Sequence, residues 1–326
     1  MRTTTVVTAV SCALGLAAAL LLPGCDKPAP PNPIDGERAL AHVRAMVELG
    51  PRPSGSPALY RCRDYIVGRL RELGLEPVVD KWSDDAGKPE VPSFFNVEVE
   101  IPGTRAGDPR LLVVGSHYDT KRTDGHTDPM QQGMRFVGAN DAGSSSGLLL
   151  ELARHFKAAP LPVTLHLVWF DGEESIPWEW DDARALFGSR RAVARLRERF
   201  PAPVRESVPV MVLLDMVGAR DLHIVKDTLF SDPELVDLFA GVAAELGHEE
   251  RFFRTSMPVK DDHMPFANVS IKTIDLIQFR PEDQAAWWHK DGDDLDLLSA
   301  SSLATVGHVV ATALPRIVDK WYPPRP

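Results

Sequence analysis

Apolar residues recur along this chain in two alternating patterns, one typical of helices and the other of buried strands. Residues 40–47 keep the three- to four-residue spacing that places side chains on one face of a helix. Residues 111–116 instead form an apolar run of strand length. By the same patterns we expect helices near 59–73, 148–156 and 302–317, and strands near 95–101, 167–170, 210–214 and 270–279. This alternation predicts a single α/β domain, in which a mixed central β-sheet is flanked by helices on both faces.

Polar residues with metal-binding chemistry stand where these strands end. Glu173 and Glu174 follow the run 167–170. Two neighbouring carboxylates at the end of a buried strand are costly unless a cation or a shared proton neutralises them. The other strand-end and turn positions of this kind are His117, Asp141, Asp215 and His289. Carboxylates and imidazoles suit zinc, and open α/β sheets gather their sites at strand ends, so the pattern predicts a zinc site.

The charge of the chain narrows the choice of partner. The formal net charge is −10, and the sequence has no basic stripe and no interleaving of aromatic and basic residues. This composition argues against nucleic acid as a partner. Acidic residues also cluster around the predicted site, where they would attract both a metal cation and a substrate amine.

Several of these polar phrases resemble a known family, and they occur in the family's order. They are similar to phrases of the glutaminyl cyclases (glutaminyl-peptide cyclotransferases) of the animal type, which belong to the M28 clan of zinc aminopeptidases. The resemblance extends from about Asp35 to the C-terminus. The phrases are His117–Lys121, Phe136–Asp141, Phe170–Glu174, Leu213–Ala219, Asp261–Phe266 and Trp288–His289. The resemblance implies the same mixed-sheet fold.

The resemblance also implies an activity and a set of roles. A glutaminyl cyclase closes the N-terminal glutamine of a peptide or protein to pyroglutamate and releases ammonia. One zinc ion is then expected on Asp141, Glu174 and His289, with its fourth position open for water or substrate. The residues expected to move or share protons are Glu173, Asp215 and Asp261, with Asp262 as an alternative to Asp261. Trp178 and Trp288 are expected to form the walls of a small slot for the substrate glutamine.

Two alternatives remain at this point. The first is an M28-type aminopeptidase with two zinc ions, the second of which would be held by His117, Asp215 and a bridging Asp141. In an extended segment Asp119 points to the same side as His117, so Asp119 is expected to orient this imidazole. The second alternative is a binding protein without activity, but such a protein would be expected to have lost a ligand or the proton-shuttling Glu173.

The N-terminus predicts export. Residues 6–22 are apolar, and Leu22–Cys25 resembles a lipobox, so we expect residues 1–24 to be a lipoprotein signal peptide. Residues 25–34 are expected to be a proline-rich linker that does not pack, ahead of a catalytic domain at 35–326. A lipid on Cys25 would anchor a bacterial lipoprotein to the inner or outer membrane of the cell envelope, facing the extracytoplasmic side.

Cysteine usage agrees with this organisation. Once Cys12 is cleaved off and Cys25 is lipidated, only Cys62 remains, so no disulfide can form within the chain. Animal cyclases carry a disulfide close to the active site, and the matching positions here are Ser116 and Ser146. We expect Cys62 to be a small buried apolar residue.

Overall fold

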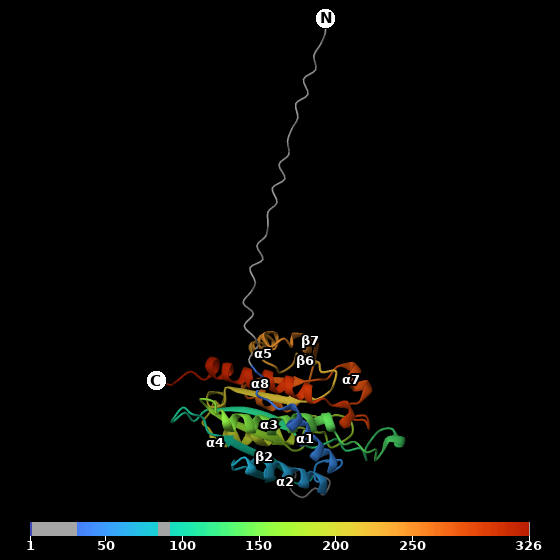
Figure 1. Cartoon of the computed structure of the whole chain (residues 1–326). Helices are drawn as coiled ribbons and strands as arrows, with labels where there is room; N and C mark the ends of the chain where they lie inside the picture. Colours follow the sequence, from blue (N-terminus) through green and yellow to red (C-terminus); the bar gives the residue numbers. More distant parts are fainter. Residues whose placement is uncertain (2–30, 84–91, 326) are drawn as a thin grey trace.

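The computed structural model describes Met1, residues 31–83 and residues 92–325 (Figure 1). Within these residues eight strands form one sheet in the order β1-β2-β4-β3-β5-β8-β6-β7. The strands are β1 (Val78–Trp82), β2 (Phe94–Ile101), β3 (Leu111–His117), β4 (Thr164–Phe170), β5 (Val210–Asp215), β6 (Ile224–Asp227), β7 (Phe252–Met257) and β8 (Lys272–Ile277). The central neighbours β4, β3, β5 and β8 run parallel, whereas β2 pairs antiparallel with β1 and β4, and β6 with β8. The prediction of a mixed central sheet is confirmed.

Side chains alternate between two apolar layers along each central strand. In β3, Leu112 and Val114 face the larger layer, and Val113 faces the smaller one. Helices α1 (Gly36–Glu48), α2 (Pro57–Glu72), α3 (Ser145–Ala158), α5 (Pro233–Glu245) and α8 (Ala300–Trp321) cover the larger layer. Helices α4 (Phe187–Arg199) and α6 (His263–Ala267) cover the smaller layer. Helix α7 (Pro281–Ala286) and the turns η1 (Pro129–Gln131), η2 (Ala139–Ser144), η3 (Val204–Glu206), η4 (Glu249–Arg251) and η5 (Leu295–Leu297) complete the described elements. Helices therefore flank both faces, as predicted.

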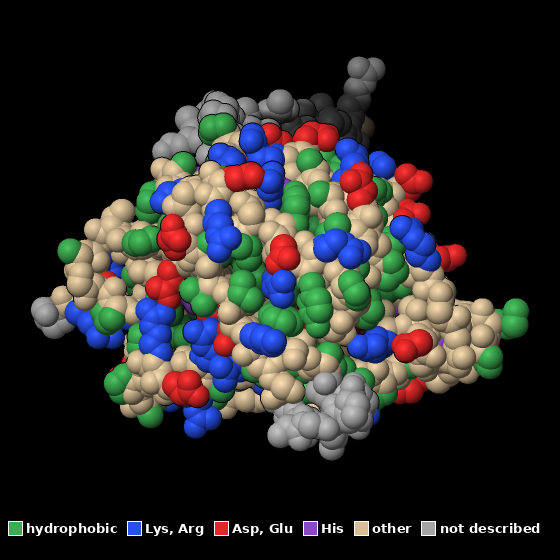
Figure 2. Space-filling model, turned by 90° about the horizontal axis from the view of Figure 1, so that it is seen from below, with side chains coloured by type: hydrophobic (Ala, Val, Ile, Leu, Met, Phe, Trp, Pro, Cys, Tyr) green, Lys and Arg blue, Asp and Glu red, His purple; other side chains and the backbone are tan. Residues whose placement is uncertain are grey.

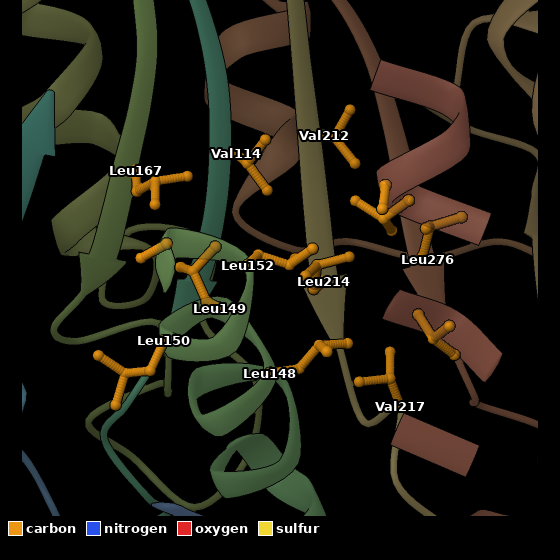
Figure 3. Close-up of a cluster of buried hydrophobic side chains, with 14 of the residues drawn as sticks. Val114, Leu148, Leu149, Leu150, Leu152, Leu167, Val212, Leu214, Val217 and Leu276 are labelled. Atoms are coloured by element: carbon orange, nitrogen blue, oxygen red, sulfur yellow. The ribbon is translucent and has the colours of Figure 1, made fainter. Parts of the chain in front are cut away.

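The larger layer fixes α3 against the strands. Figure 3 shows Leu148 and Leu152 of α3 in one apolar cluster with Val114 of β3 and Leu214 of β5, and all four side chains are fully buried or nearly so. Burying one such side chain contributes about 1.5–3 kcal/mol. Because η2 leads directly into α3, this packing also fixes the turn that carries Asp141.

Helix α8 belongs to the core. Among the described residues it is the helix long and apolar enough to cross a membrane, but 72% of its apolar window is buried inside the fold. It packs against α1, α3 and α5. The predicted closing helix at 302–317 is therefore a core helix of the domain.

The packed part of the chain begins slightly earlier than predicted. Asn32 donates a side-chain hydrogen bond to the carbonyl group of Ala304 at 2.9 Å, and Ile34 is buried against Gly307 of α8. Residues 32–34 therefore do not behave as the expected unpacked linker, because Ile34 fills an apolar gap beside a glycine. The signal peptide at 1–24 and the lipidated Cys25 fall outside the described residues, and both stay predictions.

The surface in Figure 2 is mixed in charge. On the face shown there, Lys and Arg side chains are interspersed with Asp and Glu side chains and with small apolar areas. Part of the positive charge of the protein is paired. Arg191 of α4 lies 2.7 Å from Asp80, and Arg195 lies 2.9 Å from Glu98. Partly exposed pairs of this kind contribute at most about 1 kcal/mol each.

Candidate metal centre

Four of the predicted site residues meet at the carboxyl ends of parallel strands. His117 is the last residue of β3, Asp215 is the last residue of β5, and Glu173 and Glu174 follow β4. Because β4, β3 and β5 are neighbours that run in the same direction, their ends open onto one shared space. All four side chains are buried.

Asp141 reaches this space from the turn η2, which is held from two sides. The carboxylate of Asp293 accepts hydrogen bonds from the N–H groups of Asn140 at 2.6 Å and Asp141 at 3.0 Å. The guanidinium of Arg52, which is fully buried, donates to the carbonyl groups of residues 137–138 at 2.7 and 3.0 Å. No local pattern predicted a role for Arg52 or Asp293, yet together they fix the position of Asp141.

The three residues predicted to bind a metal lie together. The ligand atoms of Asp141, Glu174 and His289 are all within 4.8 Å of one another. His289 Nε2 lies 3.1 Å from Glu174 Oε1 and 3.4 Å from Asp141 Oδ2. The buried Glu174 Oε1 has no hydrogen bond of suitable geometry within the described residues. Two carboxylates and an imidazole that converge with an unsatisfied oxygen fit a divalent cation.

The charges of the metal-free set neutralise one another. Burial alone would lower the pKa of His289, but the carboxylates of Glu174 and Asp141 outweigh burial and raise this pKa to about 9. Burial would raise the pKa of Glu174, but His289 and Lys121 hold it below its usual value. The ammonium group of Lys121, which had no predicted role, lies 3.5 Å from Glu174 Oε2 and is buried. A cation that binds here must therefore displace the proton of His289.

A second set of ligands shares Asp141 with the first. The ligand atoms of His117, Asp141 and Asp215 also lie within 4.8 Å of one another. His117 Nε2 is 3.2 Å from Asp141 Oδ1 and 3.3 Å from Asp215 Oδ1. Asp141 thus offers one oxygen to each set. The described geometry contains the ligand sets of both the one-metal and the two-metal alternatives.

Asp119 holds the residues around it in place. Its Oδ1 lies 3.4 Å from Nδ1 of His117, which agrees with the expected orienting contact. Its carboxylate also accepts hydrogen bonds from the N–H groups of Glu173 at 3.3 Å and Glu174 at 3.4 Å. Because Asp119 is fully buried, these contacts are shielded from water. Asp119 therefore fixes the turn that carries both glutamates, while its contact with His117 lacks hydrogen-bond geometry within the described residues.

The predicted proton-sharing residues form a buried acidic group. Burial raises the pKa of Glu173 well above its usual value, and the carboxylate of Asp261 adds to this effect. Burial and the neighbouring Asp215 likewise raise the pKa of Asp261. Burial also raises the pKa of Asp215 itself. Crowded carboxyl groups share protons in preference to ionising fully. Asp261 lines the pocket described below, whereas Asp262 does not.

Asp275 on β8 extends this group into the core, and no local pattern predicted this role. It is fully buried, and neither carboxylate oxygen has a hydrogen-bond partner within the described residues. Burial and the charge of Asp261 raise its pKa well above the usual value. Burial without a partner therefore favours the protonated form of Asp275 over the carboxylate.

We expect Asp275→Asn to increase the free energy of unfolding at pH 8 by about 1–3 kcal/mol. A carboxyl group whose pKa is raised on folding costs stability as the pH rises above its unfolded pKa, which is about 4. Asparagine does not titrate, so the gain should be largest at pH 8 and should shrink toward pH 4. Urea unfolding at both pH values measures the difference. An equal or larger gain at pH 4 would contradict a raised pKa of Asp275 in the folded protein.

A pocket of about 220 Å³ gives access to these groups. Trp178 and Trp288 line it, as expected, and Trp288 stacks on His289 with ring centroids 3.9 Å apart and an interplanar angle of 22°. Trp180 also lines the pocket and is 40% exposed, although sequence reasoning left it without a role. The other apolar lining residues are Met216, Val259, Ile277 and Phe279. Trp287 is buried in the core behind the site and does not line the pocket.

Two residues of the site hold a backbone conformation that is rare for residues other than glycine. Met216, which follows Asp215, has a φ of 50°, and His289 has a φ of 53°. A residue held in this left-handed region costs about 1–3 kcal/mol and persists only when its surroundings hold it. Strained backbone therefore occurs at the candidate site itself.

Hydroxyl groups stand at the two positions that the resemblance matches to a disulfide of animal cyclases. The Oγ atoms of Ser116 and Ser146 lie 3.3 Å apart, and Ser116 Oγ donates to Ser145 Oγ at 2.9 Å. Ser146 Oγ also donates to the carbonyl group of His117 at 2.6 Å. These bonds tie the start of α3 to the end of β3. Cys62 is fully buried as expected, and burial raises the pKa of its thiol to about 11.

A mixed sheet whose parallel strands end in carboxylates and a histidine beside one pocket has the form of an α/β enzyme site that could hold a metal ion. The chain belongs to peptidase family M28, whose family profile matches residues 96–314. This match and the relatives below confirm the resemblance seen in the sequence.

Named relatives extend this comparison. The glutaminyl-peptide cyclotransferase of Gloydius blomhoffii is 27% identical over 290 residues, which span 79% of this chain and 75% of the relative. The crystal structure of a glutaminyl cyclase from an Acidobacteriales bacterium is 28% identical, with a TM-score of 0.76, and the match covers 93% of this chain and 99% of that one. A Zn-dependent exopeptidase from Parabacteroides distasonis shares the fold at 22% identity, with a TM-score of 0.73 and coverage of 85% and 96%.

Proposed function

We propose that this protein is a zinc-dependent glutaminyl cyclase, which converts the N-terminal glutamine of peptides or proteins to pyroglutamate and releases ammonia. The relatives named glutaminyl cyclase, which match most of the chain, support this activity. One observation carries the proposal. A small pocket walled by Trp178 and Trp288 reaches Asp141, Glu174 and His289. Buried Glu173 lines the same pocket.

In this proposal Asp141, Glu174 and His289 hold one zinc ion. When bound, zinc supplies Lewis acidity that makes the side-chain amide carbon of the glutamine more electrophilic. The α-amine of the substrate forms a bond to that carbon, and the carbon–nitrogen bond to the leaving group breaks. Glu173 accepts the proton that the α-amine loses and gives a proton to the departing ammonia.

The acidic group around Glu173 suits this proton transfer. A glutamate with an ordinary pKa would be a poor proton donor near neutral pH, and burial corrects this by raising the pKa of Glu173. Asp215 and Asp261 are buried beside it, with raised pKa values of their own. We infer that they share protons with Glu173, so that Glu173 can be ionised when it accepts a proton and protonated when it donates one.

The tryptophans position the substrate. Trp288→Ala should lower the efficiency of cyclisation roughly a hundredfold, because the change removes an aromatic wall of the pocket and the substrate orientation that it provides. Metal content should hardly change, since the ligand atoms are on His289. Trp321→Ala, at the end of α8, is the control and should leave kcat/KM within about twofold. A loss of metal equal to the loss of activity would contradict a role in substrate binding.

The two-metal aminopeptidase is the second candidate, because His117 and Asp215 complete a second ligand set around Asp141. One preparation assayed side by side for ammonia release from Gln-peptides and for hydrolysis of aminoacyl-arylamides tests both functions. We expect ammonia release to dominate. Robust arylamide hydrolysis without ammonia release from Gln-peptides would replace the cyclase proposal by the peptidase.

We further propose that the protein is exported and anchored to the cell envelope by a lipid on Cys25. The apolar residues 6–22 and the lipobox-like Leu22–Cys25 support this location. Full-length protein should fractionate with membranes, and Cys25→Ser should move it to the soluble fraction. Membrane association that survives this substitution would contradict the lipid anchor.

A further inference from the structure

The carboxylate of Asp227, at the end of β6, is a buried hub of hydrogen bonds outside the metal sets. It is 2% exposed and accepts hydrogen bonds from the N–H groups of residues 229–231 at 2.8–2.9 Å. It also accepts one from the N–H group of Val259 at 3.0 Å, and it contacts Nε2 of His263 at 3.0 Å. These five donors satisfy both oxygens of one carboxylate.

Two of the five donors come from a segment distant in sequence that borders the active pocket. Val259 and His263 mark the ends of residues 259–263. Within this segment Val259, Lys260 and Asp261 all line the pocket. Asp227 thus forms hydrogen bonds to both ends of a five-residue segment. The middle residue of this segment is Asp261, the proposed proton-sharing residue.

Asp261 has few other contacts that fix its side chain. One carboxylate oxygen accepts a hydrogen bond from the adjacent N–H group of Asp262, and the other has no partner within the described part of the chain. The placement of the Asp261 carboxyl group therefore depends mainly on the backbone that carries it. That backbone is anchored through Val259 and His263.

The surroundings of His263 make this anchor rigid. The imidazole is fully buried at the first turn of α6 and lies edge-on to Phe230, with ring centroids 5.8 Å apart. Its Nδ1 faces the buried Asp275 of β8 at 3.8 Å. A buried carboxylate bonded to an imidazole and four amides is a strong, directional contact, because charge-assisted hydrogen bonds in a dry interior are stronger than neutral ones.

We propose that Asp227 and His263 are positioning residues, which set the placement of Asp261 in the pocket and so the rate of the proton transfer there. Neither residue lines the pocket or belongs to a metal ligand set, so we infer that they influence Asp261 through segment 259–263. Misplacement of a reacting group by about 1 Å can cost on the order of a hundredfold in rate. The expected change in rate rests on the proposed function. The anchoring of segment 259–263 by Asp227 does not.

The first test compares Asp227→Asn with Asp232→Asn in the full-length protein. Asp232 caps α5 in the same connection after β6 and does not touch segment 259–263, so it is a matched control. We expect Asp227→Asn to lower kcat by about tenfold or more, with bound zinc unchanged and a smaller effect on KM. Asp232→Asn should stay within about twofold of the parent.

Coupling to Asp261 distinguishes positioning from general damage. In a background that already carries Asp261→Asn, adding Asp227→Asn should lower kcat by less than about twofold, because the group being positioned is already gone. Independent, multiplying effects of the two substitutions would overturn the proposal. A loss of zinc in Asp227→Asn would overturn it as well.

Substitutions of His263 test the same proposal even if Asp227→Asn folds poorly. His263→Gln keeps an N–H donor for Asp227, whereas His263→Leu removes it. We expect His263→Gln to retain several-fold more activity than His263→Leu at equal thermal stability. Equal activity of the two would overturn the proposal.

Hydrogen–deuterium exchange gives a readout that needs no substrate. Peptides covering residues 259–263 should exchange faster in Asp227→Asn than in Asp232→Asn, with the peptide around His289 unchanged. If the parent shows no cyclisation, the proposed function fails while this measurement still tests the anchor. Unchanged exchange at 259–263 would overturn it.

Discussion

Glu173→Gln is expected to lower the rate of glutamine cyclisation by at least about a hundredfold while bound zinc is retained. Glutamine keeps the size and polarity of the side chain, but it can neither accept the proton of the α-amine nor pass one to ammonia. The predicted ligand atoms are on Asp141, Glu174 and His289, so metal content should stay at the parental value. Single-turnover kinetics, with zinc measured on the same sample, separates chemistry from binding.

Glu179→Gln is the matched control, because Glu179 lies on the same loop and is exposed. It should leave both rate and metal content unchanged. If Glu173→Gln instead lost zinc but kept a near-normal rate per bound metal, the roles of the two adjacent glutamates would have to be exchanged.

The dependence of kcat on pH should also reflect the role of Glu173 as a general base. Burial raises the pKa of Glu173 above the value of about 4.3 that is usual for glutamate. A general base stops working when it is protonated, so the acidic fall in kcat should occur at a higher pH than for an ordinary glutamate. The Glu173→Gln variant should lack this acidic fall in kcat. If the fall persisted unchanged, a group other than Glu173 would be responsible for it.

The main helices and strands of the fold could be predicted because each has its own apolar pattern in the local sequence. The apolar runs that become β3 and β5 read as strands, and the spacing around Leu148 reads as a helix. The start of the packed domain was misplaced by a few residues. Ile34 stands in a proline-rich stretch, and its burial against Gly307 depends on a contact with the far end of the chain.

The meeting of His117, Glu173, Glu174 and Asp215 was predictable to the same extent, because these residues stand at or just after strand ends that the sheet must bring together. Asp141 and His289 reach the same space from the turn η2 and from the segment after α7.

The supporting residues were not predictable in this way. Arg52 bonds residues 137–138, Asp293 bonds the turn of Asp141, and Asp227 bonds His263, at sequence separations of 85, 152 and 36. No local pattern marks such pairs, and only the folded arrangement shows which buried charges meet.

Removal of the metal is the change with the largest expected effect. Chelation should abolish activity, and one equivalent of zinc per chain should restore it. Asp141 belongs to both ligand sets, whereas His289 and His117 each belong to one. We therefore expect His289→Ala to lose tight zinc binding and activity, and His117→Ala to keep one zinc ion. Two tightly held equivalents, both needed for turnover, would favour the peptidase.

The affinity for zinc should also depend on pH in a direction that the site determines. The pKa of His289 in the metal-free site is raised to about 9, so below that pH zinc must displace its proton. Affinity should then rise by roughly tenfold per pH unit between pH 6 and pH 8 for each proton released. Calorimetric titrations in buffers of different ionisation enthalpy measure this release. A pH-independent affinity, without proton release, would mean that His289 is neutral before the metal binds and that the carboxylates of Glu174 and Asp141 do not hold its charge.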